Sequence, residues 1–561
     1  FSLATNPLEV SSDLQIVDVS INGKGDGISS VKLVWTGLNG VIGQDILQSS
    51  DKELTNGWKR FFTTRKVPRG SKWVKLVCET KNESAWWDDA EITGHFLKRP
   101  VLRAMVNQLG YEQNAPKRFT AQCDFPATSG HFEILNRNEN PVYTGELKSQ
   151  GRINGAFGHD WGFNYWQGDF SEFKQNGTYR IRITFDKLVD VSWPFEIAEN
   201  LLWENTAAAA YHFFYYQRCG MEIPGFHKAC HLDDATNEAH TIQLDLAGGW
   251  HDAGDYNKYH NAPYVFGLAT AFGLATDNFG KIDTDDNGQA DFLDEILWGA
   301  DFSRRMIYKD GSVGGGLTSG WGFYGAPEQE TDNIPGTGDE RVLLKTISGN
   351  DPSMQTAACA KVARYTPDAS KYIESAKRGL DWALEHNIRG SLQLSAATDL
   401  YVATGDKAFA KIAKELFSEV GMKDVVIARE FDKVFGQDHS VEIKEGVIAD
   451  AERLLSFAQN PFGVCAYGPV DKPNFFGTPA KEYKFELGSN SYLLESATKV
   501  ALAYEYKPDP RFLTFIYDQF NWILGNNPFD LCMMEGFGSK NPPSYHHRYV
   551  LAGVPRGAVP G

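Results

Sequence analysis

A chain of 561 residues is too long for a single hydrophobic core, and at about 100–200 residues per domain it predicts about three domains. Its 42% hydrophobic and 23% charged residues are typical of folded globular protein, which excludes a wholly disordered chain. The formal charge of −17 disfavours nucleic acid and anionic lipid as partners. The sequence also lacks an apolar run of about 18 residues that could form a transmembrane helix.

The first third of the chain has the pattern of β-strands. Runs rich in β-branched and aromatic residues, such as 180–185 with its polar–apolar alternation, are separated by turn residues such as Asn176-Gly177. This pattern predicts two all-β sandwich domains, residues 1–98 and residues 99–198.

The rest of the chain, residues 199–561, has a helical pattern. Hydrophobic periodicity and helix punctuation, such as Asp509-Pro510 before one segment and Gly405 after another, predict eleven helices. They cover residues 203–219, 255–277, 288–308, 352–366, 369–386, 391–405, 407–420, 423–430, 446–460, 489–505 and 509–524. The sequence therefore predicts a multidomain protein in which an all-α domain follows two sandwiches.

Two carboxylates three residues apart, Asp252 and Asp255, flank an Ala-Gly turn just before one predicted helix. Such a turn can direct both side chains into one cleft, where they can hold and deprotonate a single water. The alternative is helix capping, because Asp before a helix is an ordinary N-cap. Spacing alone favours capping.

Several motifs in the same order resemble glycoside hydrolase family 9, the inverting cellulases. They are Asn107-Gln-Leu-Gly-Tyr111, Gly248-Gly-Trp-His-Asp-Ala-Gly-Asp-Tyr-Asn-Lys-Tyr259, Asn287-Gly-Gln-Ala-Asp-Phe-Leu-Asp-Glu295, Leu524-Gly-Asn-Asn-Pro528 and His546-His-Arg548. The first of these motifs, Asn107–Tyr111, is similar to the start of the immunoglobulin-like domain that precedes the catalytic domain in one subgroup of this family. The resemblance implies an (α/α)6 barrel catalytic domain after an immunoglobulin-like domain, and it covers residues 105–561.

The resemblance also implies roles for individual residues. Asp255 corresponds to the general base, and Asp252 to the partner that holds the nucleophilic water. The family's general acid is a Glu on a later helix, which we expect beyond Gly561, because only eleven of the barrel's twelve helices are predicted and the barrel is expected to be truncated at its C-terminus. His546 and Arg548 correspond to substrate-contacting residues. Beside what the resemblance implies, Trp321, in the aromatic stretch 312–345 that could wall the cleft, and Tyr259 are also expected to bind substrate.

A second group of residues is typical of a metal site. Two thiolates and two imidazoles form the ligand set of a closed structural zinc site, and here they would come from Cys219, Cys230, His231 and His251. A disulfide between Cys219 and Cys230 is the alternative. The resemblance favours zinc, because the same subgroup has such a site beside the loop that carries its general base. In this chain that loop is residues 248–259, called the base loop below.

A third pattern matches the calcium loop of an EF-hand, with Gly288 at its sixth position and Asp in place of the usual final Glu. The predicted calcium ligands are Asp283, Asp285, Asn287, Gln289, Asp291 and Asp294. The alternative is a solvated acidic turn before a helix.

The first 98 residues resemble a carbohydrate-binding β-sandwich. Trp86 or Trp87 could stack on a sugar ring, although a core position is the more common fate of a Trp at a strand start.

The sequence as a whole predicts a monomeric, secreted endoglucanase that cleaves β-1,4-glucosidic bonds of cellulose or related β-glucans with inversion. A signal peptide is expected to have been removed, because the chain starts at Phe1 without Met. An exo-acting β-glucosidase or β-glucosaminidase of the same fold is one alternative, and a non-catalytic polysaccharide-binding protein without the general acid is another.

Overall fold

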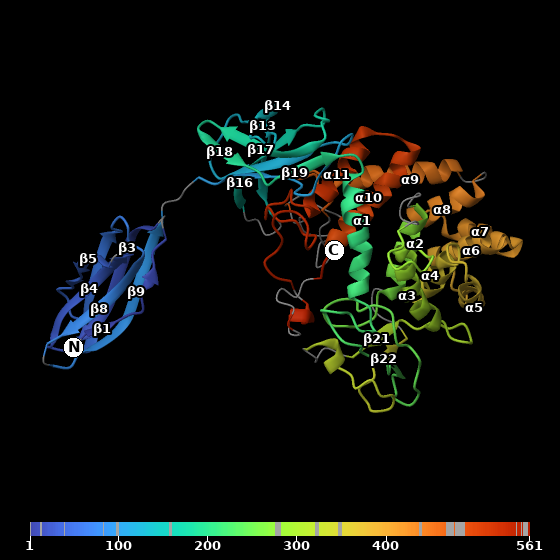
Figure 1. The fold of residues 1–561 in the computed structure, drawn as a ribbon, viewed down its shortest axis with the longest axis horizontal. Coiled ribbons are helices and arrows are strands. Elements are labelled where there is room, and N and C mark those ends of the chain that lie inside the picture. The colour runs from blue at the N-terminus through green and yellow to red at the C-terminus, as the bar shows by residue number, and fades with distance from the viewer. Residues whose placement is uncertain are drawn as a thin grey trace. The chain divides into compact units, whose positions relative to one another are not determined.

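The structure is a computed structural model. It describes residues 2–11, 14–38, 40–81, 83–96, 100–155, 160–274, 282–319, 325–345, 351–436, 440–466, 476, 489–545, 547–550, 553 and 559–561. The chain forms two compact units, Phe1–Pro100 and Val101–Gly561 (Figure 1).

The first unit is a β-sandwich with its own core. One sheet has the order β1-β8-β4-β5, with β2 paired to β8, and the other has the order β6-β7-β3-β9. Alternation in β3 buries Val17, Val19 and Ile21 against Trp35 and Leu76 of the facing sheet. The strands are β1 (Ser2–Ala4), β2 (Leu8–Glu9), β3 (Leu14–Lys24), β4 (Ile28–Gly37), β5 (Gly40–Ile46), β6 (Gln48–Ser49), β7 (Lys59–Lys66), β8 (Trp73–Thr80) and β9 (Trp86–Phe96).

A second sandwich begins the larger unit. Its sheets have the orders β10-β12-β16-β15 and β11-β19-β17-β13-β14, with β18 paired to β17, around an aromatic core that includes Phe119, Phe132 and Phe170. The strands are β10 (Leu102–Met105), β11 (Gly110–Glu112), β12 (Arg118–Cys123), β13 (His131–Leu135), β14 (Pro141–Glu146), β15 (Lys148–Asn154), β16 (Asp160–Asp169), β17 (Gly177–Phe185), β18 (Leu188–Val191) and β19 (Phe195–Ala198).

The described part of the helical domain contains eleven α-helices, which confirms the predicted all-α class. They are α1 (Leu201–Tyr216), α2 (Asn261–Leu274), α3 (Asp291–Arg305), α4 (Met354–Val362), α5 (Ser370–Glu385), α6 (Ser391–Thr404), α7 (Lys407–Val420), α8 (Val425–Phe435), α9 (Ser440–Ser456), α10 (Ser489–Tyr506) and α11 (Pro510–Ile523).

These helices form two layers, as an (α/α)6 barrel requires. The even-numbered helices α2, α4, α6, α8 and α10 pack in succession, while α1 packs on α3, α3 on α5 and α9 on α11. The layers explain the side-chain patterns. Every residue of α4 from Gln355 to Val362 is buried, whereas α7 has one apolar face with Phe409, Ala413 and Leu416.

Helix α2 begins later than the sequence predicts, at Asn261 and not at 255. The intervening residues form a tight turn whose backbone hydrogen bonds, such as Asp252 N–H to Asn257 O at 2.8 Å, are incompatible with a helix. A small sheet that the sequence analysis missed, β20-β22-β21, lies beside this turn, because Lys258 forms a bridge with Leu317. Its strands are β20 (Thr236–Asn237), β21 (Gly316–Thr318) and β22 (Val342–Leu344).

The second sandwich and the helical domain are joined by buried polar contacts. Gln108 N–H donates to Leu524 O at 2.8 Å, and its side-chain amide donates to Asp530 O at 3.0 Å. Trp193 Nε1 donates to Asp530 Oδ2 at 2.9 Å, and Arg118 forms an ion pair with Asp518. These contacts bring residues more than 300 positions apart in sequence into one interface.

None of the described helices is both long enough and apolar enough to span a bilayer.

Candidate active site and metal centre

The loop that carries Asp252 and Asp255 is held by a buried anchor at its start. Trp250 is fully buried, and its Nε1 donates to Glu295 Oε1 at 2.6 Å. Asn261, the first residue of α2, exchanges hydrogen bonds of 2.7 and 2.9 Å with the Trp250 main chain. Gly249 has φ +71°, and a Cβ there would lie 2.5 Å from Asn261 Oδ1, so only glycine fits.

The two carboxylates have different surroundings. Asp252 accepts hydrogen bonds from the main-chain N–H groups of Tyr259 and His260, immediately before α2. Burial raises the pKa of Asp252 to about 7, and the nearby charge of Asp255 adds to the rise although the two donors oppose it. Asp252 is therefore held by the main chain that leads into α2, and its two donors precede the first residue of the helix, Asn261.

Asp255 remains half-buried and forms its hydrogen bonds within its own turn. Its carboxylate accepts from Asn257 N–H at 3.3 Å and from the Asn257 side-chain amide at 2.8 Å. These two donors leave lone pairs of the carboxylate for another donor.

The C-terminal segment with Arg548 packs directly on this loop. Arg548 is buried, and its Nη1 donates to the main-chain oxygen of Asp255 at 3.1 Å. A Cβ at Gly254 would lie 2.7 Å from His547 Cα, so this glycine permits the close approach. Arg548 lies in a short 3₁₀ turn, Arg548–Val550, and is not a surface charge.

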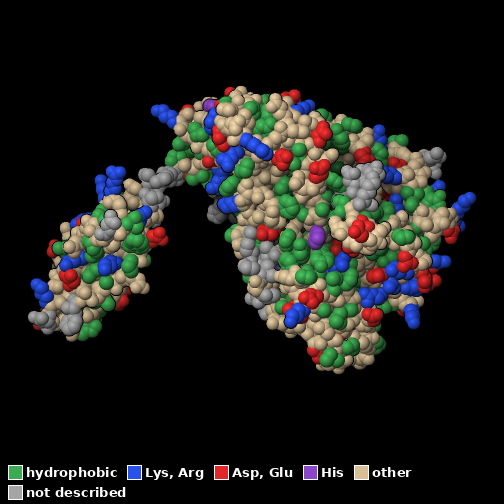
Figure 2. Space-filling view, in the orientation of Figure 1, with side chains coloured by type: hydrophobic (Ala, Val, Ile, Leu, Met, Phe, Trp, Pro, Cys, Tyr) green, Lys and Arg blue, Asp and Glu red, His purple; other side chains and the backbone are tan. Residues whose placement is uncertain are grey.

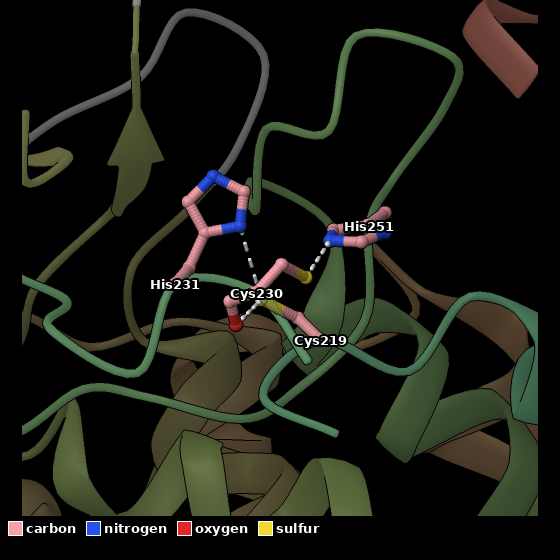
Figure 3. A group of neighbouring side chains, drawn as sticks. All are labelled: Cys219, Cys230, His231 and His251. Atoms are coloured by element: carbon pink, nitrogen blue, oxygen red, sulfur yellow. Dashed lines mark hydrogen bonds between the residues drawn. The ribbon is translucent and has the colours of Figure 1, made fainter. Parts of the chain in front are cut away.

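Four predicted ligands form one buried cluster beside the base loop (Figure 3). One ligand atom from each residue lies within 4.8 Å of the others: Cys219, Cys230, His231 and His251. Both cysteines are free thiols in the structure, so they do not form the alternative disulfide. The cluster lies close to the loop because the chain after α1 forms a β-bridge with it, in which Cys219 N–H donates to Gly249 O at 2.9 Å.

The pKa values of the four residues shift in different directions, and the hydrogen bond with Cys219 raises the pKa of Cys230 well above its usual value. Burial opposes ionisation of Cys219, but the Cys230 thiol and the cations Lys258 and Arg341 hold the pKa of Cys219 well below its usual value. Burial lowers the pKa of His251 to about 3, which keeps its imidazole neutral. His231 Nδ1 faces Cys219 at 3.8 Å, while its Nε2 lies 3.2 Å from Glu330 Oε2. A carboxylate on the far nitrogen is a common way to orient a ligating histidine.

Residues 203–556 match glycosyl hydrolase family 9, and residues 102–187 match the cellulase N-terminal Ig-like domain. The chain belongs to glycosyl hydrolase family 9. It is therefore a glycoside hydrolase of the cellulase type, with an immunoglobulin-like sandwich before its helical catalytic domain.

Relatives with known names agree with this family. The chain is 27% identical to a cellodextrinase of Butyrivibrio fibrisolvens over 507 residues, which cover 80% of this chain and 87% of that protein. It is 25% identical to endoglucanase D of Acetivibrio thermocellus over 506 residues, or 80% and 75% of the two chains. The crystal structure of a metagenome-derived family 9 endoglucanase has the same fold, with a TM-score of 0.65 and 23% identity, and covers 82% of this chain and 89% of that one.

The predicted calcium loop is assembled only in part. Three carboxylates bring oxygens within 4.8 Å of one another: Asp283, Asp285 and Asp291. Asp294 instead accepts hydrogen bonds from the side-chain amides of Asn287, at 2.8 Å, and Gln289. Asp291 and Asp294 also occupy the first turn of α3, where the helix dipole favours acidic residues without any ion.

Of the three remaining predicted substrate residues, the structure describes only Tyr259. Tyr259 is half-buried on the base loop, and burial raises its pKa. Trp321 and His546 lie outside the described residues.

A buried ion network that the sequence does not predict lies next to the cluster. Asp234 pairs with Lys258 Nζ at 2.8 Å and with Arg341, and all three side chains are fully buried. Asp234 and Arg341 are 107 residues apart, and in a sequence such charges look like ordinary surface residues. Only the fold identifies them.

Proposed function

We propose that this family 9 enzyme hydrolyses β-1,4-glucosidic bonds of cellulose or related β-glucans with inversion at the anomeric carbon. The observation that supports the proposal most is the position of Asp255 where the C-terminal segment packs on the base loop, since Arg548 Nη1 donates to Asp255 O at 3.1 Å. The Asp255 carboxylate bonds within its own turn, to Asn257, whereas the Asp252 carboxylate is held by the main chain just before α2.

In this mechanism Asp255 accepts a proton from the water that attacks the anomeric carbon. Asp252 helps to hold the same water and keeps the loop in register with α2. An inverting hydrolase separates its base and its acid by roughly 6.5–9.5 Å so that water fits between the base and the sugar. The base loop described above supplies the water-activating side of that arrangement.

Substrate contacts are proposed for four residues: Tyr259, Trp321, His546 and Arg548. Arg548 is a cation that contacts the main chain of Asp255, so its remaining N–H groups can bind a sugar hydroxyl close to this residue. The cellodextrinase among the relatives makes short cello-oligosaccharides the first substrates to compare with long β-glucan chains.

Cys219, Cys230, His231 and His251 are proposed to hold a structural zinc ion. The set fits zinc because it combines two thiols with two imidazoles in a closed, fully buried cluster. A bound zinc would crosslink the end of α1 to the base loop. We also propose a weaker calcium site at the turn before α3, with Asp283, Asp285 and Asp291 as its ligands.

The first unit is proposed to bind β-glucan through the outer face of sheet β6-β7-β3-β9. Trp86 is 59% exposed and Phe62 is 45% exposed, and both side chains point outward because they pair with Lys24 and Ser20, on the solvent face of β3. Trp87 instead packs on Phe61 in the core, with ring centroids 6.0 Å apart. Figure 2 shows hydrophobic side chains exposed among charged ones on this unit. An aromatic face bordered by polar groups suits a sugar ring.

We further propose that the enzyme acts outside the cell as a monomer.

The test of the proposed reaction is the anomeric form of the first product. We expect proton NMR of fresh digests of cello-oligosaccharides to show the α-anomer of the newly formed reducing end before mutarotation. Accumulation of the β-anomer would exclude inversion, and hydrolysis of other glycans without β-1,4-glucan cleavage would exclude the substrate class.

A further inference from the structure

All three guanidinium nitrogens of Arg341, a residue that the proposed mechanism does not use, make polar contacts. It lies just before β22 and is fully buried. Its Nε lies 3.0 and 3.1 Å from the two carboxylate oxygens of Asp234, and its Nη2 also donates to that carboxylate. Its Nη1 donates to Tyr256 O, and its Nη2 lies 3.1 Å from Cys219 Sγ.

The contact with Tyr256 falls at the most constrained point of the base loop. Tyr256 follows Asp255 directly and has φ +60°, a left-handed conformation that is strained for a bulky residue. Such a conformation persists only when surrounding contacts hold it. Here Arg341 holds the carbonyl of Tyr256, and Gly325 O accepts the Tyr256 hydroxyl at 2.9 Å.

Lys258 extends the same network to the start of the loop. Its ammonium group pairs with Asp234 at 2.8 Å and donates to Gly248 O at 2.7 Å and Leu246 O at 3.3 Å. The carboxylate of Asp234 therefore orients two cations, and these cations hold the main chain on both sides of the Asp252–Asp255 turn.

The Arg341 guanidinium also contacts the cysteine–histidine cluster, through the same Nη2 that donates to Asp234. The network of Asp234, Lys258 and Arg341 carries one more positive than negative charge in a fully buried place. A buried excess charge requires a partner, and the Cys219 sulfur is in contact with Arg341. One planar group thus contacts both a candidate metal ligand and the residue next to the candidate base.

We propose that Arg341 is a positioning residue that couples the cysteine–histidine cluster to the conformation of the base loop, an inference that rests on the proposed role of Asp255. Lysine cannot replace it, because a single ammonium group cannot reach Asp234, Tyr256 O and Cys219 Sγ together. Loss of Arg341 lets the Asp255–Tyr256 main chain move.

The test compares Arg341→Lys with the matched control Arg364→Lys. Arg364 is also a largely buried arginine, paired with Asp399 on α6 and Glu430 on α8. Hydrogen–deuterium exchange of peptides that cover 251–260 reports loop order without any need for activity. We expect Arg341→Lys to speed exchange in these peptides by about tenfold or more and to lower kcat by about 10- to 100-fold with KM little changed. Arg364→Lys should change neither.

Three results would overturn the proposal: loop exchange in Arg341→Lys like that of the wild type, exchange that speeds equally throughout the helical domain, or an equal effect of Arg364→Lys on the loop. Should Arg341→Lys fail to fold, Asp234→Asn removes the carboxylate that orients Arg341 and must give the same local loosening. If the wild type does not cleave β-glucan, the proposed function fails, while the exchange result still decides whether Arg341 orders the loop.

Discussion

Arg548 Nη1 donates a hydrogen bond of 3.1 Å to the main-chain oxygen of Asp255, a residue 293 positions earlier in the chain. The guanidinium also lies over the Tyr256 ring, with its carbon 5.8 Å from the ring centroid. The C-terminal segment is therefore part of the base loop's environment, and Arg548 can affect catalysis through the loop as well as through the sugar.

Arg548→Lys is expected to lower kcat/KM by an equivalent of about 1–3 kcal/mol, because lysine lacks the planar fork of donors and leaves buried partners unsatisfied. Steady-state kinetics on short cello-oligosaccharides check this at unchanged Tm. Arg511→Lys, an exposed arginine paired with Glu452 and Asp509, is the control and should be neutral. Wild-type kinetics for Arg548→Lys would place this residue outside the site.

Metal analysis of protein purified without chelators should find about one zinc per chain and at least one calcium. Cys219→Ser and Cys230→Ser should each abolish zinc binding and lower Tm, since the ion crosslinks α1 to the base loop. Cys465→Ser is the control because that buried cysteine lies outside the cluster. A chain without zinc, and with two fewer reactive thiols than its seven cysteines, would indicate the disulfide instead.

Asp530 should make stability depend on pH. Burial raises its pKa to about 6, and its Oδ1 has no hydrogen-bond partner among the residues that the structure describes, while Trp193 donates to Oδ2. The folded state then holds this proton more tightly than the unfolded state, so stability is lost as the pH rises from about 4 to 6. Relative to the wild type, Asp530→Asn should gain about 2 kcal/mol between pH 4 and pH 7 in urea unfolding. Parallel pH profiles would contradict the assignment.

Trp86→Ala should weaken binding of the whole protein to insoluble β-glucan, because it removes an exposed ring from the proposed sugar-binding face. Pull-down isotherms measure the loss, which we expect to be at least several-fold. Trp73→Ala is the matched control, since Trp73 is 38% exposed but lies on the opposite sheet. Equal binding by the two variants would remove the sheet face as a sugar site.

Local patterns predicted much of this fold. Helix α11 has Asp509 as N-cap and Pro510 at its start, and α6 ends at Gly405 in a left-handed conformation, as their sequences indicate. The start of α2 was predicted too early because the turn at Asp252–Asn257 continues the helical periodicity while its hydrogen bonds do not.

The candidate site was predictable only where ligands are close in sequence. Cys230-His231 and the Asp252–Asp255 pair are local signals that a motif can capture. Glu330 beside His231, and Arg341 beside Cys219, reach the cluster from about 100 residues away, and no local pattern distinguishes them from surface charges. Long-range ion pairs of this kind require the fold.

The most direct test of the account is the rate of Asp255→Asn with β-cellobiosyl fluoride. Fluoride departs without the proton that a sugar leaving group needs, so the assay measures water activation alone. Asparagine is nearly isosteric with aspartate and can keep the contact with Asn257 N–H, but it cannot take a proton.

We predict that Asp255→Asn lowers this rate by about 100- to 10,000-fold, with oligosaccharide binding retained, and that Asp252→Asn has a smaller effect. A folded Asp255→Asn enzyme that hydrolyses β-cellobiosyl fluoride at close to the wild-type rate would contradict the assignment of Asp255 as the general base.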